Sequence, residues 1–223
     1  MPLNVILTGA TGMVGEGILL EMLDDPSIAK VLMVNRRHVD LQHPKLQELV
    51  VQDFMEFLDA DRYTAGLSGY DACFYCAGIS SIGLDEASYT EITYDTTMTF
   101  AKALRKANPE MVFIYVSGRG TDIDGKRVWA RVKGKTENGL RTTGFKAVYN
   151  FRPALMKPAK GQRNVKPLFR LVTSLYPVWA LLLPGSCNTL REVALAMIRC
   201  VERGYPTSTL EVTDIRKAAH KGM

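Results

Sequence analysis

The chain has 223 residues, of which 47% are hydrophobic and 23% charged, and its formal net charge is +5 at pH 7. This composition is ordinary for a globular protein and excludes an intrinsically disordered chain. The length allows one substantial core but not two comfortable domains, so we expect a single domain over residues 1–223. Basic residues are spread along the chain and form no recognisable motif, which argues against a nucleic-acid-binding protein.

Short apolar runs alternate with helical patterns up to residue 151. Strands are expected at 4–8, 30–35, 46–53, 70–77, 111–117 and 146–151. Helices are expected at 13–23, 86–107 and 128–142, and Pro or Gly follows the end of each. Bounded apolar strands that alternate with helices predict an α/β protein, with a doubly wound parallel sheet and helices on both faces.

The region after residue 151 departs from this pattern. Residues 154–187 are rich in proline and apolar side chains, so we expect a small C-terminal cover on the substrate side of the sheet. A helix at 189–203, a short strand at 209–212 and a helical turn at 215–219 are expected to follow. The most apolar stretch, 168–184, contains Arg170 and two prolines, so no stable membrane span is expected. We interpret this stretch as a packed helix or lid, with peripheral membrane contact as the alternative.

The four cysteines and the N-terminal residues bear on the cellular compartment of the protein. Cys73 and Cys76 have C-x-x-C spacing, but on a strand an odd spacing of three directs their sulfurs to opposite faces. No second ligand pair completes a zinc site, so we expect no metal. Residues 4–8 are too short for the apolar region of a signal peptide. We therefore expect buried thiols and a cytoplasmic protein.

A glycine-rich turn, Gly9-Ala10-Thr11-Gly12-Met13-Val14-Gly15, follows the first strand. At a strand–helix junction, such a turn brings backbone amides and a helix N-terminus close to a pyrophosphate. Gly9 allows the sharp turn, Gly12 the close approach of the phosphates, and Gly15 the close packing of helix on sheet. The placement indicates a nicotinamide dinucleotide site that includes Gly9, Thr11, Gly12, Met13, Val14 and Gly15.

The end of the second strand indicates which dinucleotide is bound. An NAD site usually offers a carboxylate to the adenosine ribose here, but this chain has Arg36 and Arg37. Two arginines can hold a 2′-phosphate, so we expect NADP, with NAD as the alternative; both side chains could also be solvated surface charges. Asp53 is expected to reach the adenine amino group. The small residues of Cys76-Ala77-Gly78 are expected to let the backbone pass near the cofactor.

These residues together resemble a known family, the atypical and extended short-chain dehydrogenase/reductases. The resemblance rests on the glycine loop, Arg36-Arg37, Ala77-Gly78, Tyr115-Val116-Ser117, Lys133 and Phe151-Arg152-Pro153. Residues 132–137 and 210–215 are most similar to the Tat-interacting oxidoreductase group and its bacterial relatives, the NAD-dependent epimerase/dehydratase-like proteins. The resemblance implies a Rossmann fold with bound NADP(H). It does not define a substrate, because the branch includes reductases, epimerases, dehydratases and non-catalytic regulators.

The resemblance also implies a catalytic set of Ser, Tyr and Lys. In this family the Lys holds the nicotinamide ribose and lowers the pKa of the Tyr one turn before it, the Tyr moves a proton, and the Ser orients the substrate oxygen. Lys133 matches the lysine and Ser117 approximately matches the serine, but Trp129 occupies the tyrosine position. Pro153, Ala154 and Leu155 are expected to wall the nicotinamide end of the cofactor.

Trp129 leaves the proton donor open, because an indole N–H donates a hydrogen bond but does not ionise in a useful pH range. Tyr94, Tyr115, Ser117 or a water could supply the proton, or Trp129 could simply pack in the core. We expect an NADP(H)-dependent oxidoreductase or isomerase that acts on an unknown small carbonyl substrate, and a homodimer is compatible with the sequence. The alternative is a cofactor-binding regulatory or interaction protein with little turnover.

Overall fold

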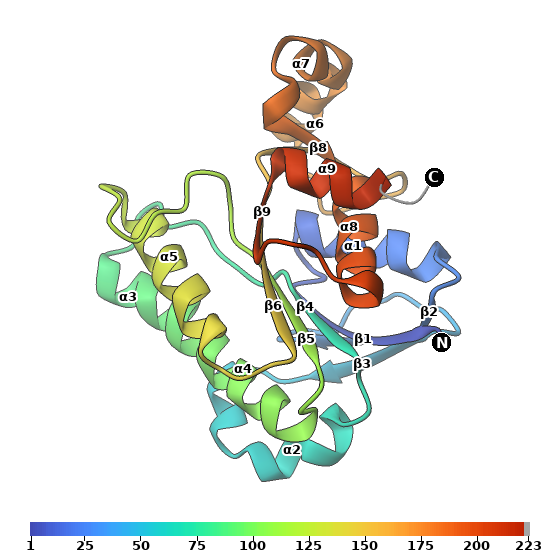
Figure 1. Cartoon of the computed structure of the whole chain (residues 1–223), viewed down its shortest axis with the longest axis vertical. Helices are drawn as coiled ribbons and strands as arrows, with labels where there is room; N and C mark the ends of the chain where they lie inside the picture. The colour runs from blue at the N-terminus through green and yellow to red at the C-terminus, as the bar shows by residue number, and fades with distance from the viewer. Residues whose placement is uncertain (221–223) are drawn as a thin grey trace.

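A seven-stranded parallel sheet forms the centre of the molecule (Figure 1). The computed structural model describes residues 1–220, so residues 221–223 of the expected domain lie outside the described residues. The strands are β1 (Leu3–Thr8), β2 (Ile28–Asn35), β3 (Leu46–Val50), β4 (Ala72–Tyr75), β5 (Val112–Val116), β6 (Ala147–Arg152) and β9 (Thr209–Glu211). Their spatial order is β3-β2-β1-β4-β5-β6-β9. The chain order reverses between β1 and β4, which confirms the expected doubly wound sheet.

Helices cover both faces of this sheet (Figure 1). One layer contains α1 (Met13–Asp24), α8 (Leu190–Arg203) and α9 (Val212–His220). The other contains α2 (Ala60–Leu67), α4 (Thr96–Ala107) and α5 (Val128–Arg141). Side chains of β1 alternate between the two layers: Val5 and Leu7 lie in the first core and Ile6 in the second. The expected two-faced packing is therefore confirmed.

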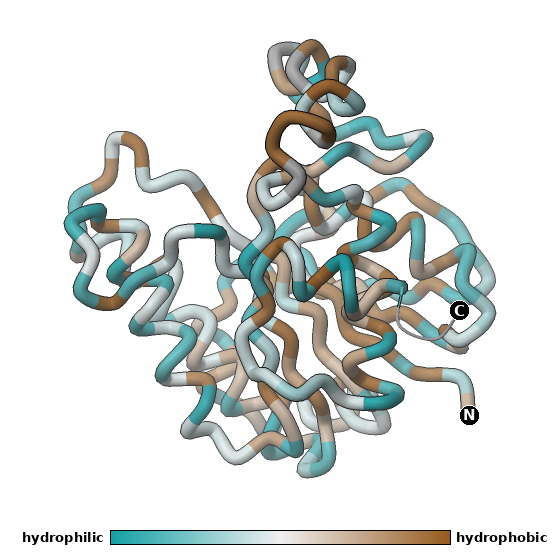
Figure 2. The backbone as a smooth tube through the Cα atoms, turned by 45° about the horizontal axis from the view of Figure 1, so that its top comes forward, coloured by the Kyte–Doolittle hydropathy of each residue, from teal (hydrophilic) through white to brown (hydrophobic). Residues whose placement is uncertain are grey.

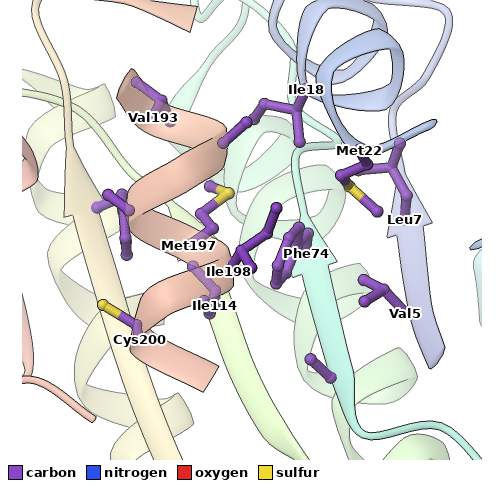
Figure 3. Packing of buried hydrophobic residues seen from close by; sticks show 14 of the residues in the cluster. Val5, Leu7, Ile18, Met22, Phe74, Ile114, Val193, Met197, Ile198 and Cys200 are labelled. Carbon is purple, nitrogen blue, oxygen red and sulfur yellow. The ribbon is translucent and has the colours of Figure 1, made fainter. Parts of the chain in front are cut away.

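The first core joins the two ends of the chain (Figure 3). Ile18 and Met22 of α1 and Met197 and Ile198 of α8 gather over Phe74 of β4, and all five are buried. Ile18 and Met22 are four residues apart on α1, and the buried Val193, Met197 and Cys200 of α8 recur at i, i+4 and i+7, so each helix presents an apolar face. The C-terminal third of the chain therefore completes the packing of the N-terminal helix.

The structure differs from the sequence expectation between residues 50 and 107. The expected strand 46–53 ends at Val50, because Asp53 caps a 3-10 helix, η1 (Phe54–Leu58), and its carboxylate accepts the Met55 N–H at 2.9 Å. η1 and α2 make the crossover to β4, where we expected no helix. The expected helix 86–107 consists of α3 (Glu86–Thr90), a π-helical turn η2 (Glu91–Asp95) and α4.

Residues 155–189 form a small substructure beyond β6. β7 (Leu155–Lys157) pairs in parallel with β8 (Cys187–Thr189), and η3 (Pro184–Ser186) leads into β8. Between them, α6 (Pro167–Ser174) and α7 (Tyr176–Leu182) project from the body as a hairpin in which Figure 2 shows hydrophobic stretches. Each helix carries a proline in its first turn, where no N–H is needed. Within the described part of the chain, no helix combines the length and apolar character that crossing a bilayer requires.

Candidate cofactor and active site

The site residues expected from the sequence lie at the carboxyl ends of neighbouring parallel strands. The glycine loop follows β1, residues 76–78 follow β4, Ser117 follows β5 and Pro153 follows β6. β1, β4, β5 and β6 are adjacent in the sheet, so these segments line one edge. Arg36 and Arg37 follow β2, on the other side of β1. In doubly wound sheets, ligands bind outside this edge, at the point where the strand order reverses.

The glycine loop is too tightly packed for side chains at two positions. Gly9 has a φ of +74°, and a Cβ there would lie 2.7 Å from the backbone of Cys76 and Ala77. A Cβ at Gly15 would lie 2.1 Å from the carbonyl oxygen of Gly9. α1 begins directly after Gly12, whose lack of a side chain leaves the first amides of the helix open. Open amides and the helix dipole favour an anionic group at this position.

A cavity of about 810 Å³ opens beside this loop, which is the size of a small-ligand or cofactor site. Its lining contains Gly9, Thr11, Gly12, Val34, Asn35, Arg36, Arg37, His38, Gln52, Phe54, Cys76, Ala77 and Gly78. Most of the residues expected at the adenosine and pyrophosphate end of a dinucleotide are thus brought together. Met13, Val14 and Gly15 continue from the loop into α1 and are not part of this lining.

The end of the cavity beside β2 has a basic rim, and the carboxylate of Glu48 holds one member of this rim in place. Arg36, Arg37 and His38 are exposed at the rim. Glu48 of β3 has a side chain that is 15% exposed, and its Oε2 lies 2.5 Å from Nδ1 of His38. Its Oε1 accepts the backbone N–H of Val39 at 2.9 Å. Glu48 therefore holds the loop after β2 in place and is not part of the cavity lining.

Asp53 lies beside the cavity but is absent from its described lining. Its Oδ1 accepts the Met55 N–H as the cap of η1, so one of its two carboxylate oxygens already has a partner. The residues on either side, Gln52 and Phe54, line the cavity instead. A glutamine amide can both donate and accept hydrogen bonds, as the edge of an adenine requires. Neither residue belongs to a motif that the sequence alone would identify as part of the site.

Ser117 and Lys133 meet at the end of β5. Lys133 Nζ donates a hydrogen bond to the Ser117 carbonyl oxygen at 2.7 Å. Ser117 Oγ lies 2.8 Å from Thr121 Oγ1, which in turn donates to the Gly118 carbonyl oxygen at 2.8 Å. Thr121 has one hydroxyl proton, so in this arrangement Ser117 donates to Thr121 and keeps its lone pairs as acceptors. Thr121 thus sets the orientation of the Ser117 hydroxyl.

A buried carboxylate, which an arginine holds in place, influences the pKa of Lys133. Glu137 lies one turn after Lys133 on α5, and its side chain is 2% exposed. Arg152 of β6 donates to both oxygens of Glu137, at 2.9 and 2.6 Å, and to Glu211 of β9 at 3.2 Å. Burial lowers the pKa of Lys133 to about 8, and the Glu137 carboxylate partly opposes this change. Lys133 therefore titrates only slightly above neutral pH.

Trp129 lies one turn before Lys133 and is half-buried. Its six-membered ring packs against the loop that follows Ser117, because Cβ atoms at Gly118 and Gly120 would lie 4.0 and 3.7 Å from ring carbons. Among residues 1–220, its indole N–H has no hydrogen-bond acceptor. Trp129 thus supports the loop beside Ser117 with its ring, and its N–H remains available as a donor.

The two tyrosines considered as proton donors lie away from this position. Tyr115 is 2% exposed, and burial raises its pKa well above the usual range. The ring of Tyr94 lies 4.2 Å from Nζ of Lys135. Lys135 follows Lys133 by two residues, or about 200° around the helix, so Tyr94 packs on the opposite side of α5. Ser117 and a water molecule therefore remain as candidate proton donors.

The cysteines lie in separate environments. All four are free; Cys73 lies in the core beneath α2 and α4, and Cys76 packs against the core beneath α1 and α8. The expected placement of the two sulfurs on opposite faces is confirmed. Within residues 1–220, no group of three or more His, Cys, Asp or Glu side chains is arranged to hold a metal ion.

A comparison with known protein families shows which family the chain belongs to. The profile of the NAD dependent epimerase/dehydratase family matches residues 5–122, which is more than half of the chain. The chain belongs to this epimerase/dehydratase family. The match runs from β1 through the glycine loop and Ser117 to Asp122, so it covers the cavity and the end of β5.

Proteins similar to this epimerase/dehydratase family member occur in fungi and mammals. Protein fmp52-1, mitochondrial, of Aspergillus oryzae is 30% identical over 169 residues, which cover 72% of this chain and 68% of that protein. Protein HTATIP2 of Rattus norvegicus is 26% identical over 153 residues, covering 69% of this chain and 62% of that protein. The second match confirms the expected resemblance to the Tat-interacting group.

Solved structures share the fold at low sequence identity. The dTDP-glucose 4,6-dehydratase DesIV of Streptomyces venezuelae, with NAD bound, has a TM-score of 0.66 at 18% identity and covers 93% of this chain and 74% of its own. The ADP-L-glycero-D-manno-heptose-6-epimerase of Helicobacter pylori has a TM-score of 0.66 at 14% identity. The match covers 96% of this chain and 80% of the epimerase chain. These matches confirm the Rossmann fold of the family.

Of the residues expected near the nicotinamide, Pro153 contacts the loop that follows Ser117. The Pro153 carbonyl oxygen accepts the Arg119 N–H at 3.0 Å, so Pro153 lies opposite the loop that follows Ser117. Ala154 precedes β7 and Leu155 begins it. Glu137 could have been found from the sequence, because residues four apart share a helix face. Thr121 and Glu48 depend on contacts that carry no local sequence signal.

Proposed function

We propose that the chain binds NADP(H) in preference to NAD(H) and acts as a reductase or isomerase on a small carbonyl compound. The observation that carries this proposal is the cavity rim of Arg36, Arg37 and His38, with no acidic side chain in the described lining. Guanidinium groups bind phosphate through paired, charge-assisted hydrogen bonds, whereas the ribose hydroxyls of NAD require an acceptor. The carboxylate of Glu48 is already engaged by His38 and Val39.

The edge of the sheet also fits the rest of a dinucleotide. Side chains at Gly9 and Gly15 would overlap neighbouring backbone, and the open amides after Gly12 suit a pyrophosphate. The bound nicotinamide supplies or accepts a hydride. In this proposal, Lys133 binds the nicotinamide ribose with the N–H groups that its bond to the Ser117 carbonyl leaves free.

Ser117 and Trp129 hold the substrate oxygen. The Ser117 hydroxyl turns from Thr121 toward this oxygen, and the available Trp129 N–H donates to it. Neither group ionises near neutral pH, so in this proposal the Ser117 hydroxyl passes its proton to the substrate oxygen and regains one from bulk solvent through a water molecule. Residues 154–187 cover this side, since Arg119 donates hydrogen bonds to Ser186 and, at 3.4 Å, to the Gly185 carbonyl oxygen.

We also propose that the protein is cytoplasmic. We propose that it is a single domain in which residues 154–187 form the cover. Free cysteines suit a reducing compartment. The name of the Aspergillus oryzae relative contains the word mitochondrial, so that relative does not support a cytoplasmic location. This part of the proposal rests on the free cysteines alone.

Titration calorimetry with NADPH and NADH tests the cofactor preference. We expect NADPH to bind roughly tenfold or more tightly, since hydrogen bonds to charged groups contribute about 1.5–3 kcal/mol each. The variant Arg36→Ala/Arg37→Ala should lose this preference. Arg62→Ala, which removes a 65% exposed arginine on α2, is the matched control and should keep it. Equal affinities for the two cofactors in the unmodified protein would contradict the proposal.

Stopped-flow absorbance near 340 nm with pooled carbonyl compounds tests turnover. We expect the unmodified protein to oxidise bound NADPH slowly, because water replaces an ionisable side chain as the proton source. Trp129→Tyr should raise the rate by roughly 10²-fold, the lower end of general acid catalysis.

The position of Trp129 favours a second candidate, a cofactor-binding regulatory or interaction protein. Binding of NADPH without hydride transfer by the unmodified protein, together with transfer by Trp129→Tyr, would support this candidate. Hydride transfer by the unmodified protein would reject it.

A further inference from the structure

The α6–α7 hairpin projects from the body of the molecule (Figure 1), and Figure 2 shows hydrophobic stretches along its backbone. Several of its apolar side chains are exposed, and we call them the leucine stripe. Six of them are between 49% and 81% exposed: Leu171, Leu175, Val178, Leu181, Leu182 and Leu183. Leu171 and Leu175 are one turn apart, and Val178, Leu181 and Leu182 have the spacing of one face of α7. Single exposed hydrophobic residues are normal on a protein surface, but a cluster of this kind marks an interaction surface.

The hairpin and its base are cationic. No Asp or Glu occurs between Glu137 and Glu192. The basic side chains that precede or begin the hairpin are exposed: Lys157, Lys160, Arg163, Lys166 and Arg170. Glu16 of α1 contacts the base, but its oxygens accept the backbone N–H groups of Arg163 and Asn164 at 2.8 and 2.7 Å. The positive side chains of the hairpin are therefore not neutralised by the segment itself.

The charge pattern discriminates between possible occupants of this surface. A second copy that docked the same stripe symmetrically would bring two cationic segments together with no acidic residue in either, which is unfavourable. An anionic bilayer surface attracts clustered Lys and Arg residues, and leucines insert below the headgroups. Phe169, Tyr176 and Trp179 add the aromatic side chains that favour such an interface.

We propose that the α6–α7 hairpin docks the protein on bilayers that contain anionic lipids, with the leucine stripe inserted in the interface. The helices are too short to cross the bilayer, so the contact is peripheral. The hairpin lies outside the described lining of the cofactor cavity, so docking and cofactor binding are separable.

Flotation of the full chain with vesicles tests this proposal. We expect binding to phosphatidylcholine vesicles that contain phosphatidylglycerol, and little binding to phosphatidylcholine alone. Leu181→Gln/Leu182→Gln should weaken binding roughly tenfold or more, because two inserted apolar side chains are lost. Lys166→Gln should weaken it roughly fivefold, as expected for one cation at an anionic surface.

Matched variants keep the test specific to the hairpin. Leu58→Gln/Ile82→Gln removes two side chains that are 72% and 90% exposed elsewhere on the molecule, and Lys102→Gln removes an exposed lysine of α4. Both should bind vesicles like the unmodified protein, and all variants should keep the same NADPH affinity.

Three outcomes would overturn the proposal. The first is that the protein does not bind anionic vesicles at low salt. The second is that the hairpin variants and the control variants lose vesicle binding equally. The third is that the unmodified protein is a dimer that does not bind vesicles, and that Leu181→Gln/Leu182→Gln converts it to a monomer. The last outcome would assign the stripe to a second copy.

Discussion

The glycine loop has no room for even one additional carbon atom at Gly15. Its missing Cβ would lie 2.1 Å from the Gly9 carbonyl oxygen, so Gly15→Ala must push α1 away from the loop. We expect a loss of about 1–3 kcal/mol in the free energy of unfolding, as for other overpacked sites, and at least roughly tenfold weaker NADPH binding. Chemical denaturation and calorimetry measure both. Gly66→Ala, where a Cβ meets nothing within 4 Å, should instead stabilise α2 by up to about 1 kcal/mol and leave binding unchanged.

At the scale of elements, α5 places Lys133 and Glu137 on one face and thereby couples cofactor binding to pH. Lys133 has a pKa of about 8, so its ammonium form, which binds the ribose hydroxyls best, declines above that pH. We expect the NADPH dissociation constant to rise above pH 8, measured by fluorescence titration. Glu137→Gln removes the charge that raises this pKa, so the rise should begin at lower pH. The control variant Glu211→Gln removes the other carboxylate partner of Arg152, and its NADPH dissociation constant should still begin to rise near pH 8. If the rise in Glu137→Gln began at the same pH as in the unmodified protein, Glu137 would not raise the pKa of Lys133.

For the whole molecule, local patterns predicted the sheet and the cofactor loop, and they failed where distant contacts decide the structure. The apolar runs and the glycine turn identify their own elements, so β1, β2 and α1 lie close to their expected positions. Phe54 and Phe57 bury in the second core and draw residues 54–58 into a helix that no periodicity predicted. The pairing of Glu137 with Arg152 and that of Glu48 with His38 each join separate elements. Such pairs depend on the completed sheet, which is why the electrostatics of the site could not be derived from its motifs.

The packing of α1 against α8 also determines when the protein can finish folding. Ile18 and Met22 leave the ribosome early, but their partners Met197 and Ile198 belong to the last part of the chain. At about 5–20 residues per second, the apolar face of α1 waits roughly ten to thirty seconds for α8 to be synthesised. During this interval α1 is the only described helix of its layer that covers the first half of the sheet, and the part of its apolar face that meets α8 stays exposed. Nascent chains of this protein should therefore depend on holding chaperones more than on any slow step after release.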